Sequence, residues 1–348
     1  MHGAHADAVV AEWRTGGTPG GRGFRMKRPM MFASILLLAS TAAHAAATSE
    51  TYPSRPIRAV VPLFAGAGTD IIARRMTAQL AQRLGQQIVV DNRPGASTTL
   101  GTQLVAKSTP DGYTLLVATT STLSVLPSVM KPPYDTVKDL TPIAAFCVSP
   151  FVYVVSNESR FRTFNDLLAA ARAAPGKLTF GSSGTGTLTH MVVELLAVAA
   201  KVNMQHVPYK GVTGAYADVL GGRIDFVADS PASATPNIKA GRFRALAMTT
   251  PKRSALLPDV PTVAELGFPA AESDFVTGLL APAGTPPAVI ARLQTETLNV
   301  ARSAEFRDFL AQQGYEPLTL DGRQFSERIR TELEKWRKVV RERNIKAE

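Results

Sequence analysis

The amino-acid sequence predicts an α/β protein whose short strands pair mostly in parallel sheets. Three observations predict this class: β-rich runs recur along the chain, loops of small or polar residues follow several of them, and stretches with helical apolar spacing come next. The composition, 45% hydrophobic and 19% charged over 348 residues, is that of a globular chain long enough for two cores. Fibrous and disordered classes are excluded.

The first strand, loop and helix begin at residue 57. Residues 57–61 form a β-rich run, and residues 64–68 form a loop of small residues. The next stretch carries one apolar face and ends at Gly85, a residue type that favours the left-handed C-cap conformation. That face consists of Ile72, Met76, Leu80 and Leu84. Further strands are expected at 88–90 and 113–117.

A second series of strands and helices begins at residue 151. The expected strands are 151–155, 178–180 and 224–228, and the expected helices are 167–173, 190–200 and 212–220. The chain ends in a helix with the apolar stripe Phe325, Ile329, Leu333, Trp336 and Val340.

The N-terminal segment predicts export. Residues 26–45 combine the basic pair Lys27 and Arg28, a short apolar run at 30–38 and a small-residue cleavage signal ending at Ala45. This pattern is typical of a secretory signal peptide, and the apolar run is too short to span a bilayer. The alternative is a buried N-terminal helix. We interpret residues 1–25 as an upstream extension.

Charge and cysteine content narrow the possible partners. Removal of residues 1–45 takes away five basic and two acidic residues, which lowers the formal net charge from +10 to +7. This excess suits an anionic ligand, but the basic residues are scattered, so no nucleic-acid partner is expected. Cys147 is the only cysteine, which excludes an internal disulfide and predicts a buried thiol.

Two loops are candidate binding sites because each lies between a strand end and a helix start. The first is Phe64–Asp70, and the second, rich in glycine and hydroxyl groups, is Ser182–His190. Open α/β sheets bind ligands at the carboxyl ends of their strands. Helix N-termini add unpaired N–H groups and a partial positive charge, so these loops could hold an anion without arginine.

Three familiar motifs of nucleotide binding and catalysis are incomplete in this sequence. A dinucleotide fingerprint would need glycine at Ile71, and a phosphate-binding P-loop would need lysine at Thr187. A nucleophile elbow around Ser183 would need glycine at Thr185. We therefore expect no enzyme and no cofactor. The alternative is a serine-dependent hydrolase that uses Ser183, His190 and Asp229.

Metal binding is disfavoured, and two acids have two interpretations each. His190 and His206 are the only histidines after the export signal, and their spacing argues against zinc, although a carboxylate-only metal site stays open. Asp70 either stabilises the dipole of its helix or orders the loop amides toward a ligand. Asp229 either forms a turn or contacts the ligand or hinge. His190 is expected to cap, to contact ligand or to pack.

An ordered set of motifs resembles one receptor family. The motifs are Tyr52-Pro53-Ser54-Arg55-Pro56-Ile57, Gly68-Thr69-Asp70, Val90-Asp91-Asn92-Arg93-Pro94-Gly95, Pro110-Asp111-Gly112-Tyr113-Thr114-Leu115, Pro133-Tyr134-Asp135, His206-Val207-Pro208-Tyr209-Lys210-Gly211, Leu220-Gly221-Gly222, Leu257-Pro258-Asp259-Val260-Pro261-Thr262 and Ala281-Pro282-Ala283-Gly284-Thr285-Pro286. In this order they resemble the substrate-binding proteins of tripartite tricarboxylate transporters, the Bug-type receptors, over nearly everything after residue 51.

The resemblance implies a two-lobed periplasmic-binding-protein fold of type II, which closes on its ligand like a Venus flytrap. Lobe one would comprise residues 52–148 plus 273–348 and lobe two residues 149–272, with the two crossings as the hinge. The implied ligand-binding residues are Phe64, Gly66, Ala67, Gly68, Thr69, Asp70, Thr119, Thr120, Ser121, Ser182, Ser183, Gly184, Thr185, Gly186, Thr187, His190, Tyr209 and Asp229.

The implied function is capture of a small carboxylate in the periplasm by a monomer that delivers it to membrane permease subunits. Presentation of the ligand to a membrane sensor kinase is the alternative. The sequence departs from the family in two places: Ala65 and Ala67 stand where relatives have proline and glycine, and Val276-Thr277-Gly278 stands where many have Trp-Phe-Gly. The pocket is therefore expected to differ, and the ligand cannot be carried over.

Overall fold

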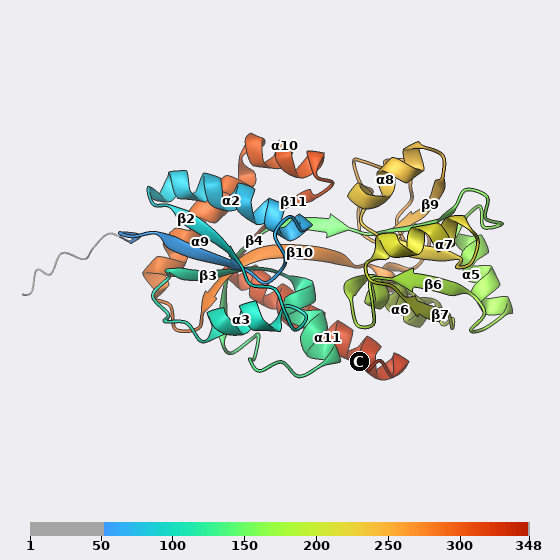
Figure 1. Cartoon of the computed structure of the whole chain (residues 1–348), viewed down its shortest axis with the longest axis horizontal. Coiled ribbons are helices and arrows are strands. Elements are labelled where there is room, and N and C mark those ends of the chain that lie inside the picture. Colours follow the sequence, from blue (N-terminus) through green and yellow to red (C-terminus); the bar gives the residue numbers. More distant parts are fainter. Residues whose placement is uncertain (1–51, 347–348) are drawn as a thin grey trace, which may run out of the picture. The chain divides into compact units, whose positions relative to one another are not determined.

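The computed structural model describes residues 52–346, and the expected extension and export signal lie outside this range. Two mixed β-sheets flanked by helices organise these residues (Figure 1), which confirms the α/β class. The first sheet has the order β11-β4-β10-β3-β1-β2, and the second has the order β7-β6-β8-β5-β9. The strands are β1 Ile57–Val61, β2 Ile88–Asn92, β3 Thr114–Thr119, β4 Leu140–Pro150, β5 Val152–Ser156, β6 Thr179–Ser182, β7 Gln205–Pro208, β8 Phe226–Asp229, β9 Phe243–Met248, β10 Asp274–Pro282 and β11 Glu316–Asp321.

The helices connect the strands in chain order. They are α2 Gly68–Leu84, α3 Thr99–Ala106, η1 Ser121–Val125, α4 Leu126–Val129, α5 Phe164–Ala173, α6 Leu188–Ala200, η2 Val212–Ala215, α7 Tyr216–Leu220, α8 Pro231–Lys239, η3 Pro269–Ala271, α9 Pro287–Arg302, α10 Ala304–Gln312 and α11 Gly322–Arg343. The helix expected at 212–220 is divided into a 3₁₀ turn and α7. Within residues 52–346, no helix is both long and apolar enough to cross a bilayer.

The expectation of mostly parallel sheets is wrong. Strand β1 pairs in parallel with β2 and β3, and β6 does so with β7 and β8. However, β10 is antiparallel to both of its neighbours, β11 is antiparallel to β4, and β5 is antiparallel to β8 and β9. The strands that follow the two crossings, β5 and β10, are therefore antiparallel to the neighbouring strands of the strand-helix-strand units. Apolar periodicity indicates which residues are buried but not whether neighbouring strands are parallel or antiparallel. The sequence alone therefore could not predict the antiparallel pairs.

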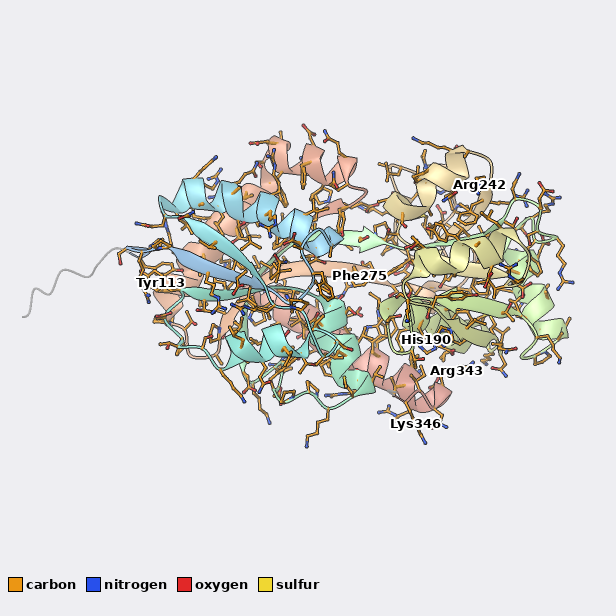
Figure 2. The ribbon with its side chains drawn as sticks, in the orientation of Figure 1. Tyr113, His190, Arg242, Phe275, Arg343 and Lys346 are labelled. Carbon is orange, nitrogen blue, oxygen red and sulfur yellow. The ribbon has the colours of Figure 1, made fainter. Side chains whose placement is uncertain are left out.

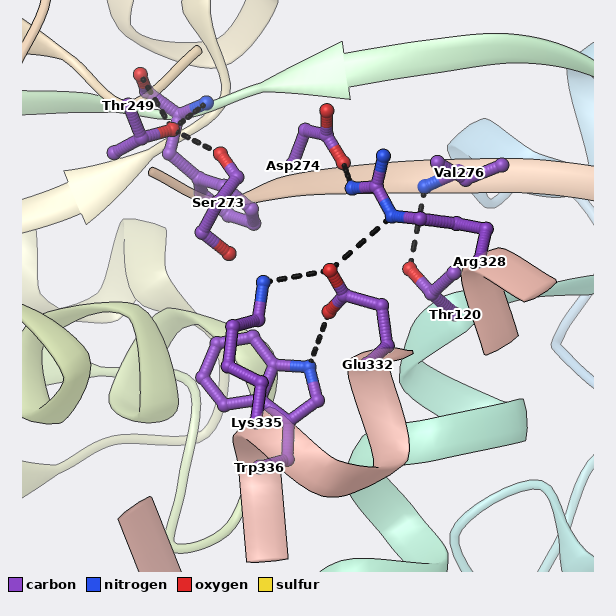
Figure 3. A network of polar contacts seen from close by, with 10 residues as sticks. Thr120, Thr249, Ser273, Asp274, Val276, Arg328, Glu332, Lys335 and Trp336 are labelled. Atoms are coloured by element: carbon purple, nitrogen blue, oxygen red, sulfur yellow. Dashed lines mark hydrogen bonds and ion pairs between the residues drawn. The ribbon is translucent and has the colours of Figure 1, made fainter. Parts of the chain in front are cut away.

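The chain crosses between the sheets twice, and the two crossings are hydrogen-bonded together. It leaves the first sheet at Phe151, between β4 and β5, and returns between β9 and β10. The Phe151 N–H donates to Thr249 Oγ1 at 3.0 Å, and the Thr249 N–H donates to the Phe151 carbonyl at 2.9 Å. Thr249 Oγ1 also donates to the Ser273 carbonyl at 2.5 Å. Figure 3 shows this contact beside β10.

Helix α11 packs against the cores of both sheets. Its first half places Phe325, Ile329 and Leu333 in the apolar cluster of the first sheet, and its second half places Trp336 and Val339 in the cluster of the second. A polar network lies where α11 passes from one core to the other (Figure 3). Glu332 accepts hydrogen bonds from Trp336 Nε1 and Lys335 Nζ, both at 2.6 Å. It also accepts one from Arg328, which forms an ion pair with Asp274 on β10.

Candidate functional site

A cavity of about 360 Å³ is lined by residues from both sheets and from the segments that join them. The loops after β1, β2, β3, β6 and β8 reach it, so the carboxyl ends of strands converge there as expected for an open α/β sheet. Phe275 on β10 also lines it and is labelled in Figure 2, between the two sheets. The lining consists of Leu63, Ala67, Gly68, Thr69, Thr98, Thr119, Ser121, Thr122, Ser149, Phe151, Ser183, Thr187, Leu188, Thr189, Asp229, Ser230, Phe275, Thr277 and Tyr315.

Helix starts and hydroxyl groups supply the polar character of this cavity. Helix α2 begins at Gly68 and helix α6 begins at Leu188, and both residues belong to the lining. No lysine, arginine or histidine is present among the described residues that line it. Any negative charge held here would therefore rely on backbone N–H groups, helix dipoles and hydroxyls.

Eight of the residues expected to bind ligand line this cavity. They are Ala67, Gly68, Thr69, Thr119, Ser121, Ser183, Thr187 and Asp229. A neighbouring cavity of about 320 Å³ shares Thr98, Ser121 and Thr187 with the first and adds Thr185 and Gly186. The other expected residues line neither cavity: Phe64, Gly66, Asp70, Thr120, Ser182, Gly184, His190 and Tyr209.

Several of these other residues have structural partners instead. Thr120 Oγ1 accepts the Val276 N–H at 3.2 Å, and Tyr209 Oη donates to Asp218 at 2.5 Å. Phe64 is 75% exposed at the tip of the first loop.

The substitution of Ala67 for the glycine of relatives causes no backbone strain, because the φ of Ala67 is −64°, while the preceding Gly66 takes the positive φ of 82°. The methyl group of Ala67 adds to the cavity wall.

Asp70 orders the first loop from behind rather than lining the cavity. Its buried carboxylate accepts the Gly66 N–H at 2.9 Å, Arg74 Nε at 3.0 Å and Asn92 Nδ2 at 2.9 Å. Burial alone would raise the pKa of this carboxyl, but these three hydrogen bonds and the nearby Arg74 charge outweigh burial and lower it. The carboxylate also lies in the first turn of α2, where an acid stabilises the helix dipole.

We expect Asp70→Ala to weaken ligand binding roughly tenfold and to lower the free energy of unfolding by about 1–3 kcal/mol, because the first loop and α2 lose three hydrogen bonds to one buried, ionised acceptor. Titration calorimetry and urea unfolding measure the two effects. Asp91→Ala is the matched control, since Asp91 also forms ion pairs with arginine, Arg58 and Arg93, but it does not hydrogen-bond the first loop as Asp70 does through Gly66. Equal losses of affinity in both variants would contradict this role.

Two stacked histidines support the second loop. His190 Nδ1 accepts the Gly186 N–H at 3.0 Å, and Ser182 Oγ lies 2.6 Å from His206 Nε2. The two imidazole rings stack with centroids 3.8 Å apart. His190 Nε2 faces Glu194 at 3.5 Å, and Glu194 pairs with Arg343 of α11. His190 therefore holds the backbone of the glycine-rich loop directly, whereas His206 acts through the Ser182 hydroxyl, which accepts the Gly184 N–H at 3.0 Å.

The hydrolase triad considered from the sequence is not assembled. Ser183 Oγ lies 2.7 Å from Thr189 Oγ1, and the ring nitrogens of His190 face Gly186 and Glu194. Asp229 contacts Tyr216 and Ser230. Among the described residues, no group of three or more His, Cys, Asp or Glu is placed to hold a metal ion.

Sequence reasoning missed most of the nonpolar wall. Phe151 and Phe275 pack with ring centroids 5.2 Å apart, each beside a crossing. Tyr315, between α10 and β11, lies over the start of α2 so closely that a Cβ on Gly68 would be 2.5 Å from its hydroxyl. These residues come from distant segments, and no local pattern marks them. Thr189 had a local signal, as a hydroxyl in the first turn of α6.

Comparison with known proteins identifies the family. Residues 72–345 match the model of the tripartite tricarboxylate transporter family receptor. The chain belongs to this family. It is therefore a solute-binding receptor and not an enzyme. It is 38% identical over 321 residues to a protein from the tcbD-tcbE intergenic region of Pseudomonas sp. strain P51, covering 92% of this chain and 96% of that one. It is 35% identical over 329 residues to BugT of Bordetella pertussis, covering 92% and 99%.

Solved structures of similar receptors confirm the two-lobed fold. A periplasmic transporter structure is 38% identical with a TM-score of 0.72, covering 85% of this chain and 99% of the other. Rpa4515 of R. palustris with adipate is 31% identical with a TM-score of 0.72, at 85% and 99% coverage. MatC of Rhodopseudomonas palustris with bound malate is 28% identical with a TM-score of 0.68, at 83% and 100% coverage.

Proposed function

We propose that this receptor captures a small organic carboxylate in the periplasm and delivers it to the membrane permease subunits of a tripartite tricarboxylate-type transporter. The observation that carries the proposal is the cavity, which combines hydroxyl groups and the starts of α2 and α6 with no cationic side chain. Similar receptors solved with adipate and malate support a carboxylate as the ligand class.

In the proposed mechanism, loop amides around Gly66–Thr69 hold one carboxylate, and the Ser182–Thr187 loop holds the distal end of the ligand and locks closure. Lobe one comprises residues 52–148 plus 273–348, lobe two comprises residues 149–272, and the crossings act as the hinge. The permease would recognise the closed monomer. In the alternative, the receptor binds its ligand in the same way but presents it to a membrane sensor kinase instead of a permease.

The test is the melting temperature of residues 46–348, unfolded and refolded to strip any captured ligand, against a panel of carboxylic acids. A ligand at 100 times its Kd stabilises the native state by about 2.7 kcal/mol, which raises the Tm by several degrees. We expect a shift confined to one class of carboxylates. Equal shifts with uncharged amides of the same acids would contradict the proposal.

We expect Ser183→Leu and Thr187→Leu each to weaken binding at least tenfold without unfolding the protein, because both side chains line the cavity and neither is fully buried. Titration calorimetry measures the affinity, and circular dichroism measures the fold. Thr331→Leu, at an exposed position of α11, is the matched control. Unchanged affinity in both cavity variants would exclude the second loop from the binding site.

A further inference from the structure

Asp229 is the only acidic side chain among the described residues that line the main cavity. It ends β8, and its side chain is buried, with the residue only 5% exposed. One carboxylate oxygen accepts the Ser230 N–H at 2.7 Å, and the other accepts the Tyr216 hydroxyl at 2.5 Å. No ion pair joins this carboxylate to a cation within residues 52–346. The cavity therefore has one acidic wall without a compensating charge.

The Asp229 carboxylate disfavours some functional groups on a ligand and favours others. A carboxylate has about four acceptor positions, and the Ser230 N–H, the Tyr216 hydroxyl and the Ser233 side chain fill three of them. A second ionised carboxylate on the ligand would meet a like charge at this wall, and the hydroxyl groups of the cavity cannot neutralise the pair. Burial raises the pKa of Asp229. A hydroxyl or ammonium group would instead donate to the remaining acceptor position, and an ammonium group would also favour the ionised carboxylate, which makes the stronger kind of hydrogen bond.

The remaining walls also disfavour a second charge. Phe151 and Phe275 pack against each other beside the cavity, and Leu63 and Leu188 add further nonpolar surface. A charged group against these side chains would lose its hydration without a partner. They suit the hydrocarbon or aromatic body of a ligand whose ionised carboxylate is held at the helix starts.

We infer that the ligand is a monocarboxylate with a hydrogen-bond donor, hydroxyl or ammonium, at its other end, and that Asp229 is the acceptor that selects it. This inference rests on the proposed function, and it narrows the carboxylates to hydroxy acids and amino acids with a nonpolar body. A simple diacid of the same length binds less tightly.

Titration calorimetry on refolded residues 46–348 at pH 8 tests the inference with matched pairs of acids. Each pair has the same length and differs only at one end: ω-hydroxy acids of four to eight carbons against the α,ω-diacids, and 4-(hydroxymethyl)benzoate against terephthalate. We expect the tightest hydroxy acid to bind at least tenfold more tightly than its diacid. Diacids that bind equally or more tightly would overturn the inference and leave the proposed function in place. If no acid of either series binds, both fail.

Asp229→Asn tests the role of the residue itself. We expect the hydroxy-acid to diacid affinity ratio to fall at least tenfold, because the amide removes the negative charge. Asp218→Asn is the matched control, since Asp218 also accepts a tyrosine hydroxyl at 2.5 Å, from Tyr209, but does not line the cavity. A ratio unchanged in Asp229→Asn would overturn the assignment. If Asp229→Asn fails to fold, the wild-type pairs alone decide the ligand class, and Asp229→Ser replaces it for the residue.

Discussion

Replacing Trp336 with alanine is expected to lower the free energy of unfolding by about 3–5 kcal/mol, which is the usual cost of removing a fully buried tryptophan. Trp336 is the largest fully buried side chain among the described residues, and it lies in the core of the second sheet although α11 begins against the first. Its loss also removes one donor from buried Glu332 (Figure 3). Urea unfolding followed by far-UV circular dichroism measures the change.

Trp336→Phe is the control that separates packing from hydrogen bonding. Phenylalanine keeps most of the ring volume but loses the N–H group, so we expect a smaller cost of about 1–3 kcal/mol. Because Trp13 precedes residue 46, Trp336 is the only tryptophan of residues 46–348, and its emission reports on the junction of α11 with the second sheet. A loss below about 1 kcal/mol in Trp336→Ala would mean that α11 does not brace the second core in solution.

Lowering the pH from 8 to 5 is expected to cost about 2 kcal/mol of stability through His206. Burial first, and then the neighbouring His190 charge, lowers the pKa of His206 to about 4, against 6.5 in the unfolded chain, while Glu194 opposes the shift. Between these two values the unfolded state binds more protons, so stability is present above pH 6.5 and is lost as the pH falls toward 4. Urea unfolding at a series of pH values measures the slope.

The variant His206→Gln removes the titrating imidazole and so measures how much of the pH dependence of stability comes from His206. The pH dependence of the variant should be shallower than that of the wild type by about 2 kcal/mol between pH 8 and 5, whatever other groups contribute to both proteins. Since His206 contacts Ser182 of the glycine-rich loop, ligand affinity should also lose part of its pH dependence. Parallel stability curves for the two proteins would contradict the role assigned to His206.

Local patterns predicted the elements well where one segment suffices. The helix with Ile72, Met76, Leu80 and Leu84 on one face ends at Gly85, whose φ of 70° is the left-handed C-cap conformation expected there. The stripe from Phe325 to Trp336 is buried as expected, and Cys147 is buried. The two helical features follow from apolar spacing and from the glycine C-cap, both of which act over one helical turn, and the buried cysteine follows from the apolar run around it.

The candidate site was predictable in part for the same reason. The two loops were found because a small-residue run between a strand and a helix is a local signal, and both contribute to the cavity. The hydrogen bonds that hold these two loops in place could not be predicted in the same way. Asp70, Ser182 and His190 were among the expected ligand-binding residues, with structural alternatives for Asp70 and His190, and all three accept a hydrogen bond from a loop N–H without lining either cavity. A residue type shows that a group can hydrogen-bond but not which side of a loop it faces.

The sequence by itself determined the α/β class, the position of the two loops and, through its ordered motifs, the receptor family. The tertiary structure alone decided the antiparallel crossings, the passage of α11 from one core to the other, and the meeting of Phe151, Phe275 and Tyr315 at one cavity. The physical reason is the distance along the chain over which each effect acts. Capping and periodicity act between residues a few positions apart, whereas strand direction and cavity walls depend on contacts between segments that are tens of positions to more than a hundred positions apart.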